Sequence, residues 1–342
     1  MSAVTSTIDS ASEGPDRAEL ERLLTALRET RAAVSRVVIG QEEIVEQLLV
    51  ALIAGGHVLL EGPPGAGKTL MVRTLGEATG LSFSRVQFTP DLMPADITGS
   101  LVLTPDENGH NTLKFQPGPV FTQLLLADEI NRATPRTQSA LLEAMQERTI
   151  SAAGTSMALP KPFFVLATQN PIEMEGTYML PEAQIDRFMF RIDVRYPSIE
   201  TLTAILHATT GSSEAHAAQS LTAENILALQ ALVRAVPIAE HVRRAVAMFS
   251  ARTQPGLDAN NAEVNRFIRF GLSPRGAQSM VLAAKGHALL AGRYNVAFED
   301  LRAVLMPAVR HRVQLNFEGT AEGIVLEDMV GRIFEAAVKA NS

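Results

Sequence analysis

The chain has 342 residues, a formal net charge of −7 and no cysteine. The absence of cysteine excludes disulfides, thiolate zinc sites and cysteine nucleophiles, and the negative charge argues against a broad basic surface for nucleic acid. Hydrophobic residues form 46% of the sequence and charged residues 20%, which is typical of a soluble globular protein with a sizeable core.

The chain begins with a polar segment followed by two helical patterns. Residues 1–16 carry few large apolar side chains, so we expect them to be disordered. Two amphipathic helices are predicted at residues 17–36 and 41–54, because leucine, isoleucine and valine recur there every three or four residues. The first residues do not resemble a signal peptide, and no apolar stretch is long enough to cross a bilayer. We therefore expect a cytoplasmic protein without membrane insertion.

Short apolar runs then alternate with helical patterns. Strands are predicted at residues 57–60, 83–88, 124–127, 163–167 and 189–194, with one helix beginning at Lys68 and another at residues 135–148. Strands separated by helices predict a three-layer α/β domain with a parallel sheet. Two turn signals, Asn108-Gly109 and Ala153-Gly154, interrupt the alternation and predict β-hairpin insertions at residues 101–120 and 149–159.

The composition changes after Pro197, where strand signals nearly vanish. Helical patterns cover residues 199–207, 223–236, 238–252, 274–290, 298–308 and 327–340, with a polar loop at residues 211–220. We therefore predict two domains after the disordered start: an α/β core at residues 17–197 and a small helical domain at residues 198–342. Short basic runs at residues 243–244 and 310–312 are interpreted as solvated helix faces.

The strongest motif runs from Gly62 to Thr69 and reads Gly-Pro-Pro-Gly-Ala-Gly-Lys-Thr. It fits the G-x-x-x-x-G-K-[ST] pattern of a Walker A phosphate loop, and it lies between a predicted strand and a predicted helix, as that motif requires. Glycines let backbone N–H groups surround a phosphate, and the helix N-terminus favours an anion. We expect Lys68 to reach the β- and γ-phosphates of ATP, and the Thr69 hydroxyl to ligate Mg²⁺.

A second motif places two carboxylates, Asp128 and Glu129, at the end of the apolar run at residues 124–127. We expect Asp128 to hold Mg²⁺ through water, and Glu129 to orient and polarise the attacking water. A strand that ends in acidic residues is common by itself, but its position downstream of the phosphate loop favours a catalytic pair. The glutamate favours ATP hydrolysis over phosphoryl transfer to a substrate hydroxyl.

Three further side chains have two interpretations each. Asn170 follows a predicted strand and either positions the lytic water or belongs to an Asn-Pro turn. Arg187 forms either an ordinary surface ion pair or a finger that reaches the ATP of a neighbouring subunit. Arg275 opens a predicted helix and either caps it or folds back onto the phosphates. The seven histidines show no metal-binding spacing.

Beyond these motifs, the sequence resembles the MoxR family of AAA+ ATPases, which is related to the magnesium-chelatase ATPase subunit. The resemblance covers nearly the whole chain from about Val37. The segments that carry it are Val37-Val38-Ile39-Gly40-Gln41-Glu42, His57-Val58-Leu59-Leu60-Glu61-Gly62, Phe88-Thr89-Pro90-Asp91, Asp96-Ile97-Thr98-Gly99, Asp128-Glu129-Ile130-Asn131-Arg132-Ala133, residues 138–147, Ala167-Thr168-Gln169-Asn170-Pro171 and residues 180–188.

The resemblance implies an AAA+ three-layer αβα P-loop domain with β-hairpin insertions, followed by a small all-α lid. It implies Asn170 as sensor 1, Arg187 as the arginine finger and Arg275 as sensor 2, with Arg191 as a second candidate for the finger. Together with the motifs, it predicts catalytic roles for Glu129, Lys68, Asn170, Arg187 and Arg275. The predicted contacts with ATP or ADP are Val38, Ile39, Gly40, Gln41, Gly62, Pro63, Pro64, Gly65, Ala66, Gly67, Lys68, Thr69, Leu70 and Asp128, and the predicted Mg²⁺ ligands are Thr69 and Asp128.

The leading interpretation is a chaperone-like ATPase that remodels partner proteins. The resemblance implies a hexameric ring, a partner with a von Willebrand factor A domain, and a client complex whose maturation or metal insertion is assisted. Two alternatives stay open. A nucleic-acid motor would share the ATPase core, but the acidic charge and the lack of interleaved aromatic and basic residues argue against it. A nucleotide-gated regulatory module would show little turnover, which the presence of Glu129 argues against.

Overall fold

The computed structural model describes residues 17–105, 110–152, 154–170, 176–210, 215–258 and 261–341. The predicted disorder at residues 1–16 and the Asn108-Gly109 turn lie outside the described residues. The same holds for Ala153 and for residues 211–214 of the predicted polar loop.

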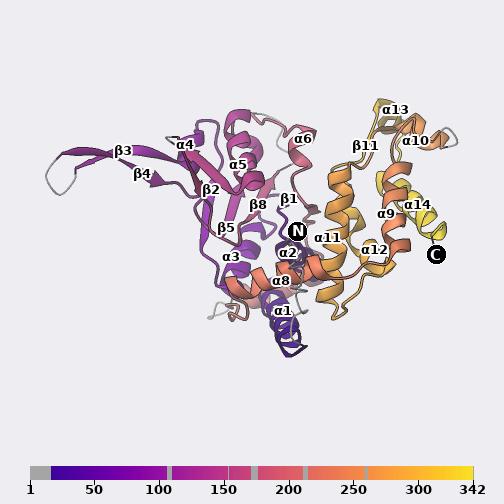
Figure 1. Ribbon diagram of the computed structural model, residues 1–342, viewed down its shortest axis with the longest axis horizontal. Helices are drawn as coiled ribbons and strands as arrows, with labels where there is room; N and C mark the ends of the chain where they lie inside the picture. Colours follow the sequence, from indigo (N-terminus) through magenta and orange to yellow (C-terminus); the bar gives the residue numbers. More distant parts are fainter. Residues whose placement is uncertain are drawn as a thin grey trace, which may run out of the picture.

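A parallel five-stranded sheet forms the centre of the α/β domain, as predicted (Figure 1). Its strands are β1 (Val58–Glu61), β2 (Phe83–Gln87), β5 (Leu124–Asp128), β8 (Phe164–Gln169) and β9 (Phe190–Asp193), in the order β2-β5-β8-β1-β9. Every neighbouring pair is parallel. The carboxyl ends of all five strands therefore lie at one end of the sheet.

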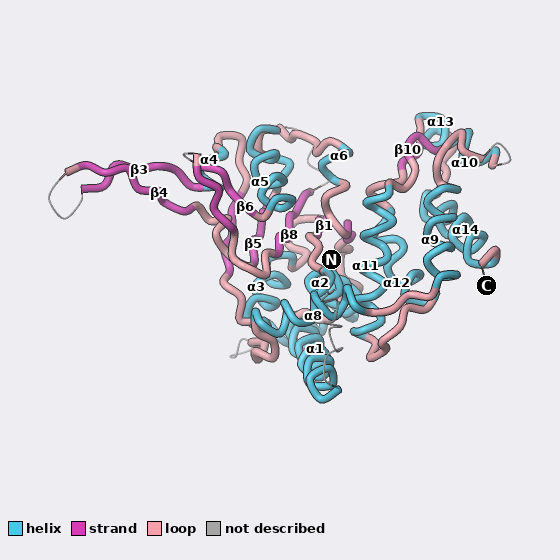
Figure 2. The backbone as a smooth tube through the Cα atoms, viewed as in Figure 1, coloured by secondary structure: helices cyan, strands magenta, loops and turns pink. Residues whose placement is uncertain are grey.

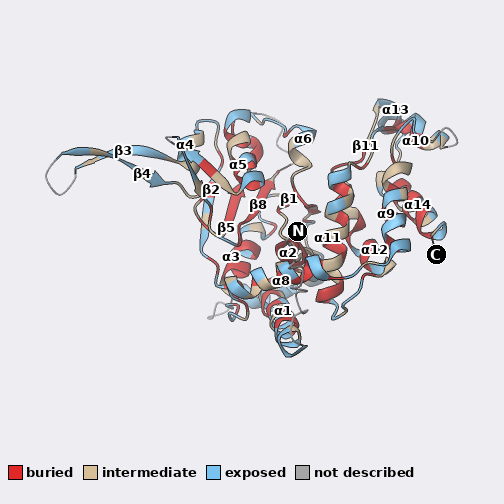
Figure 3. Cartoon of the chain, in the orientation of Figure 1, coloured by how far each residue is buried: buried red, intermediate tan, exposed pale blue. Residues whose placement is uncertain are grey.

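Both faces of this sheet are covered by helices. Val58 and Leu60 of β1 join one hydrophobic cluster and Leu59 joins another, as expected when successive side chains point to opposite faces. The first cluster includes α1 (Arg17–Val37), α2 (Glu42–Ala54) and α3 (Lys68–Thr79), and the second includes α4 (Pro94–Thr98), the 3₁₀ turn η1 (Ile130–Arg132) and α5 (Pro135–Glu147). The central strands β1, β5 and β8 are buried almost throughout (Figure 3), which explains why they are mostly apolar, whereas the edge strands β2 and β9 carry polar residues.

Two β-hairpins extend from the layered core, close to their predicted positions. The first pairs β3 (Gly99–Pro105) with β4 (Asn111–Pro117), and the second pairs β6 (Thr149–Ala152) with β7 (Thr155–Ala158). Figure 1 shows the β3–β4 ribbon projecting far from the rest of the molecule. One face of this ribbon carries Leu103 opposite Leu113, and these side chains are 67% and 63% exposed. The ribbon therefore carries exposed apolar side chains on this face.

The second half of the chain is mainly helical, as predicted (Figure 2). After α6 (Glu182–Ile185), its helices are α7 (Ile199–Thr209), α8 (Ala223–Ala235), α9 (Glu240–Arg252), α10 (Ala262–Phe267), α11 (Pro274–Leu290), α12 (Phe298–Val309), α13 (Phe317–Ala321) and α14 (Leu326–Lys339). A small sheet of β10 (Ile268–Phe270) and β11 (Gln314–Leu315) escapes the sequence pattern, because such short strands show no periodicity. Within the described ranges, no helix is both long and apolar enough to cross a membrane.

The helical half packs closely against the α/β domain. Gln230 of α8 donates a hydrogen bond to the Leu52 carbonyl of α2 at 2.9 Å. At Gly286 of α11, a Cβ atom would lie 3.3 Å from the Val50 carbonyl oxygen, so α11 and α2 approach closely at this glycine. One hydrophobic cluster therefore continues from α1 and α2 into α8, α9, α11, α12 and α14. The predicted domain boundary between residues 197 and 198 stays a prediction. Helix α8 follows this boundary in the sequence, but it packs on α2 of the α/β domain.

The basic run at residues 310–312 is not a solvated helix face, contrary to the sequence interpretation. His311 and Arg312 are only 5% and 6% exposed. All three side chains bond to the segment at residues 186–193, which leads into β9 and forms it. A charge pattern shows which side chains are polar, but it does not show that another segment covers them. By contrast, Arg243 and Arg244 are exposed, as predicted.

A charged cluster joins the two halves of the chain at His287. This side chain of α11 contacts Glu46 of α2 at 3.3 Å and Asp300 of α12 at 2.7 Å. Arg293 also pairs with Asp300, at 2.6 Å. Hydrogen bonds to Asp300 and then to Glu46 raise the pKa of His287 to about 9, against the opposing effect of burial. The imidazolium form is therefore favoured at neutral pH, where it ties α2 to the helical half.

We predict that the contribution of His287 to stability disappears at alkaline pH. Its pKa is raised from 6.5 to about 9 by folding, so its stabilisation is fully present below pH 6.5 and is lost as the pH rises through the folded-state value. Denaturant unfolding gives the difference in the free energy of unfolding between wild type and His287→Gln. This difference should be smaller by roughly 1–2 kcal/mol at about pH 9.5 than at about pH 6.5. Parallel pH dependence in the two proteins would contradict this assignment.

Candidate functional site

The predicted phosphate loop connects the carboxyl end of β1 to the start of α3. Gly65 and Gly67 have φ values of 78° and 82°, a left-handed conformation that favours glycine. A Cβ atom at either position would meet nothing within 4 Å, so the loop is open where its backbone can approach a phosphate. Gly62 is required for a different reason, because a Cβ atom there would lie 2.3 Å from the Val194 carbonyl oxygen.

Helix α3 begins at Lys68, directly after the loop. The Lys68 ammonium donates a hydrogen bond to the Gly62 carbonyl at 2.6 Å, so it lies across the loop. Thr69 and Leu70 are exposed beside it. The ammonium and the N-terminus of α3 bring positive charge to the same place, which suits a bound anion.

Asp128 ends β5 and is fixed by two neighbouring strands. Its Oδ1 accepts a hydrogen bond from the Thr168 hydroxyl of β8 at 2.6 Å, and its Oδ2 accepts one from Nη2 of Arg85 of β2 at 2.7 Å. The Thr168 hydroxyl also accepts a hydrogen bond from the backbone N–H of Glu129 at 2.8 Å. A single buried hydroxyl therefore positions both acidic residues.

Glu129 is held in an unusual conformation. Its φ is 56°, which is uncommon for a residue other than glycine and persists only where the surroundings enforce it. Its Oε2 accepts hydrogen bonds from Gln87 Nε2 at 2.8 Å and from Arg132 Nη1 at 2.9 Å. The motifs did not identify Gln87 or Arg85, because their contacts depend on β2 lying beside β5.

A cavity of about 350 Å³ joins these groups. Its walls come from the loop and α3 together with Asp128, Glu129 and Asn170. Asn170 follows β8 by one residue and is 6% exposed. Because β1, β8 and β5 are adjacent and parallel, their carboxyl ends converge on this cavity. The structure thus brings together nine of the predicted site residues: Pro64, Gly65, Gly67, Lys68, Thr69, Leu70, Asp128, Glu129 and Asn170.

A second cavity of about 260 Å³ adjoins the first at Gly65, Gly67 and Leu70. Its mostly apolar lining includes the predicted residues Val38, Ile39, Gln41 and Ala66, and also Tyr196, Pro197, Leu202 and Ile205, which the sequence did not indicate. An apolar cleft beside a phosphate site suits a planar nucleoside base. The apolar residues of α7 recur at helical spacing and could have indicated this lining, but the sequence analysis assigns that helix to the separate helical domain.

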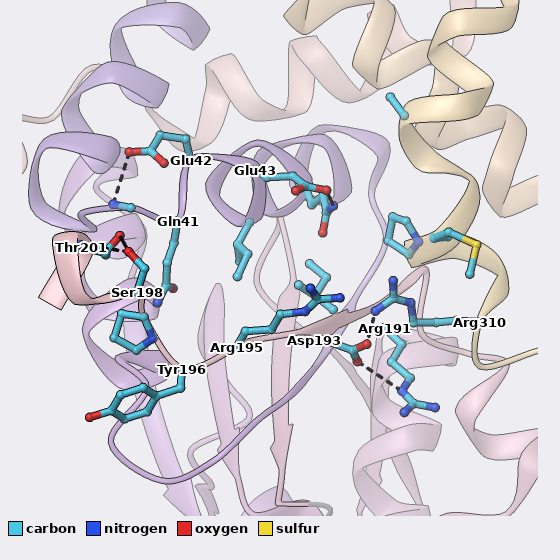
Figure 4. Close-up of a pocket in the computed structure, with 18 of the residues that line it drawn as sticks. Gln41, Glu42, Glu43, Arg191, Asp193, Arg195, Tyr196, Ser198, Thr201 and Arg310 are labelled. Carbon is cyan, nitrogen blue, oxygen red and sulfur yellow. Dashed lines mark hydrogen bonds and ion pairs between the residues drawn. The ribbon is translucent and has the colours of Figure 1, made fainter. Parts of the chain in front are cut away.

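The remaining predicted nucleotide contacts are Gly62 and Pro63 of the loop itself and Gly40, and these stay predictions. Gly62 and Pro63 line neither cavity. Gly40 lines a third, larger groove of about 720 Å³. Figure 4 shows this groove, with Arg191, Asp193 and Arg310 gathered at one side of it.

The oxygen donors at the phosphate cavity fit a magnesium ion. The Thr69 hydroxyl and the Asp128 carboxylate line the same cavity, and hard oxygen ligands are those that Mg²⁺ prefers. Across the described part of the chain, no group of three or more His, Asp or Glu side chains could hold a metal ion by itself. Mg²⁺ here would complete its shell with water and phosphate oxygens, as is usual for this ion.

The two candidates for the arginine finger differ in their partners. Arg191 of β9 forms an ion pair with the buried Glu61 of β1. Burial raises the pKa of Glu61, and Arg191 opposes that shift, so Arg191 is engaged within its own chain. The Nε atoms of both arginines are buried without a hydrogen-bond partner, so the difference lies in the ion pair: none of Arg187 occurs among the described residues.

Arg187 lies far along the sheet from the phosphate loop of its own chain. It precedes β9 by three residues, and Phe190 pairs with Val58 at the amino ends of their strands. The loop instead follows the carboxyl end of β1, so Arg187 and the loop lie toward opposite ends of the sheet.

Arg275 lies beside the same segment. The nearby Ser273 hydroxyl hydrogen-bonds to Asp186 at 3.2 Å, and neither Arg187 nor Arg275 lines the phosphate cavity. The role of Arg275 as sensor 2 stays a prediction.

Comparison with known proteins places this geometry in context. Residues 57–190 match the ATPase family associated with various cellular activities (AAA), and residues 261–332 match the AAA lid domain. The chain is 42% identical to "Chaperone MoxR1" of Mycobacterium tuberculosis, covering 88% of this chain and 79% of that protein. It is 34% identical to "Protein MoxR" of Paracoccus denitrificans, covering 87% and 92%.

A solved structure from Cytophaga hutchinsonii, described as that of a candidate ATPase, has a similar fold. Its TM-score to this chain is 0.86 at 35% sequence identity, with 93% of this chain and 96% of that chain covered. The arrangement of sheet and helical lid is therefore shared with a relative of known structure.

We predict that Thr168→Val uncouples the two acidic residues. Valine has a similar shape but no hydroxyl, so the Asp128 Oδ1 and the Glu129 N–H lose a partner. We expect the free energy of unfolding to fall by about 1–3 kcal/mol and ATP turnover to fall by roughly 10–100-fold. Nucleotide binding measured without Mg²⁺ should be unchanged. Thr168→Ser keeps the hydroxyl and serves as the matched control, and wild-type turnover in Thr168→Val would refute the positioning role.

Proposed function

We propose, starting from the fact that the chain belongs to the MoxR family of AAA ATPases, that it remodels partner proteins in a chaperone-like manner as a head-to-tail ring. ATP hydrolysis is the activity of the family. The observation that carries the ring is the separation of Arg187 from the phosphate loop of its own chain. A hexamer is the ring size that we propose, from the resemblance to other MoxR proteins.

Within one subunit, the two adjoining cavities divide the nucleotide between them. The base occupies the apolar cavity beside Val38 and Ile39, and the phosphates lie in the open glycine loop. Lys68 exchanges its bond to the Gly62 carbonyl for bonds to the phosphates. When bound, Mg²⁺ neutralises charge on the phosphate oxygens.

The lytic water is positioned by residues at the carboxyl ends of β5 and β8. Glu129 polarises this water once its carboxylate leaves Gln87 and Arg132. Asn170 holds the water beside the γ-phosphate through its amide. Both side chains line the cavity that contains Lys68, so no large movement of the backbone is needed.

The neighbouring subunit supplies Arg187. Arg191 is paired with Glu61 of its own chain, whereas the ion pairs of the described residues include none of Arg187, which favours Arg187 as the finger. A planar guanidinium suits the γ-phosphate of ATP bound by another copy. A residue that serves a second copy requires a head-to-tail interface, and such an interface can close into a ring. Arg275 lies beside the same segment and is proposed to act at the same interface.

The β3–β4 ribbon is proposed as the surface that contacts the client. Leu101, Leu103 and Leu113 are all more than 40% exposed on it, and it projects beyond the layered core (Figure 1). From the family resemblance, we propose a partner with a von Willebrand factor A domain, and a client complex whose maturation or metal insertion the ring assists. We also propose that the protein works in the cytoplasm and uses Mg²⁺ as its cofactor.

Mixed rings test whether Arg187 acts on the neighbouring site. Arg187→Ala alone should lose about 10³-fold in ATP turnover while it still binds ATP. Lys68→Ala alone should be inactive, because its own phosphate site is damaged. Mixing the two variants should restore turnover, since an intact site then faces an intact finger.

A double variant, Lys68→Ala with Arg187→Ala, provides the control for this mixture. Combined with Arg187→Ala, it offers no finger and should restore nothing. If native mass spectrometry shows mixed assemblies but the first mixture stays inactive, Arg187 does not act between subunits.

We predict that client capture depends on the apolar face of the β3–β4 ribbon. Glu129→Gln should bind ATP without turning it over, so it should hold clients long enough for a pull-down. Adding Leu103→Ser and Leu113→Ser should abolish ATP-dependent capture, because these exposed side chains supply the apolar contact. ATP turnover in the otherwise wild-type double leucine variant should be unchanged. Equal capture with and without the two leucines would exclude the ribbon as the contact surface.

A further inference from the structure

The end of α12 is bonded to the chain on both sides of Arg187. The guanidinium of Arg312 donates to the Asp186 carboxylate at 2.6 Å through Nε, and to the Asp186 carbonyl at 2.9 Å through Nη2. The same Nη2 donates to the Phe188 carbonyl at 2.7 Å. Nη1 donates to the Met189 carbonyl at 3.1 Å. One side chain of the helical half therefore holds the residues immediately before and after Arg187.

Two further residues of the helical half support the same segment. His311 Nε2 donates a hydrogen bond to the Phe188 carbonyl at 3.1 Å. The Ser273 hydroxyl, at the N-terminus of α11, lies 3.2 Å from both carboxylate oxygens of Asp186. The segment that carries Arg187 is thus bonded to the start of α11 and to the residues that follow α12.

The Asp186–Arg312 pair is buried, which makes it sensitive to substitution. The Arg312 side chain is 2% exposed and that of Asp186 is 21% exposed. An arginine in such a place depends on its carboxylate, since removal of one partner leaves a buried charge uncompensated. The pair therefore forms a rigid connection, unlike an exposed ion pair that exchanges with water.

This connection affects the position of Arg187. The Arg187 side chain has no ion pair of its own within the described ranges, so the contacts that fix its position act on the backbone from which it extends. That backbone is held by Arg312, His311 and Ser273. Any rotation of the helical lid relative to the sheet would therefore be passed to Arg187.

We infer that Asp186 is a positioning residue for the arginine finger: through Arg312 and Ser273 it joins the Arg187 segment to the lid, so that lid and finger move as one unit. The inference rests on the proposed action of Arg187 at the neighbouring subunit's ATP. It adds that the nucleotide-dependent position of the lid in one subunit controls hydrolysis in the next.

The test uses full-length Asp186→Asn, which keeps the size of the side chain but removes its charge. ATP turnover should fall by about 100-fold, the scale expected when a catalytic group is displaced by about 1 Å. The dissociation constant for ATP should be unchanged, because the phosphate cavity lies toward the other end of the sheet. Mixing Asp186→Asn with Lys68→Ala should restore turnover, since the second variant supplies a correctly held finger. Mixing it with Arg187→Ala should restore nothing.

Asp193→Asn is the matched control. Asp193 pairs with Arg310 and so also connects the end of α12 to β9, but it does not flank Arg187 (Figure 4). It should keep turnover within about threefold of wild type, because the backbone beside Arg187 stays held. An equal loss in Asp193→Asn would mean that general attachment of the lid matters, and it would overturn the specific role of Asp186.

The mixtures separate a failure of this inference from a failure of the ring. If Arg187→Ala is rescued by Lys68→Ala but Asp186→Asn is not, the finger acts between subunits and Asp186 has only a structural role. If neither is rescued, the trans-acting finger fails and the inference fails with it. Wild-type turnover in Asp186→Asn would also overturn it.

Ser273→Ala provides a second variant if Asp186→Asn does not fold. It removes one hydrogen bond to Asp186 and leaves the Arg312 pair in place, so a loss of several-fold in turnover, rescued by Lys68→Ala, is expected. Unchanged turnover in Ser273→Ala would then overturn the inference.

Discussion

The common direction of the five strands is the constraint on which the rest of the structure depends. Because all neighbouring pairs are parallel, the phosphate loop, the Asp128–Glu129 pair and Asn170 all follow carboxyl ends and meet at one cavity. The same constraint sends the segment before β9 toward the other end of the sheet. A chain built this way holds the phosphate cavity at one end of the sheet and Arg187 near the other, and the proposed ring rests on this separation.

The acidic pair illustrates how neighbouring strands refine a motif. Asp128 and Glu129 are adjacent in sequence, yet their positions are set by Thr168 of β8 and by Arg85 and Gln87 of β2. The positive φ of Glu129 is stabilised by the hydrogen bond from its N–H to that threonine. Local strain at a catalytic residue is maintained only where such surrounding contacts are strong.

The helical half is connected to the sheet at several points of different chemistry. Apolar packing joins α11 to α2, and the His287 cluster adds charged contacts at that interface. Residues 310–312 bond to Asp186 and Phe188, which lead into the edge strand β9, and to the Asp193 side chain of β9 itself. The lid thus has a structural role beside the one proposed in catalysis.

The sequence by itself determined the parallel α/β core, both hairpins, the main helices and the residues at the phosphate cavity. These follow from local signals: buried strands are apolar on both faces, helices repeat every 3.6 residues, and a phosphate loop needs glycines at fixed spacing.

Tertiary structure alone decided which side chains meet across strands and helices. Tyr196 and Leu202 beside the base cavity, Gln87 at Glu129 and Arg312 at Asp186 are far apart in sequence from the groups that they contact. It also decided that His311 and Arg312 are buried. A one-dimensional pattern records the chemistry of each side chain, whereas the partner of that side chain depends on how strands and helices are placed in space.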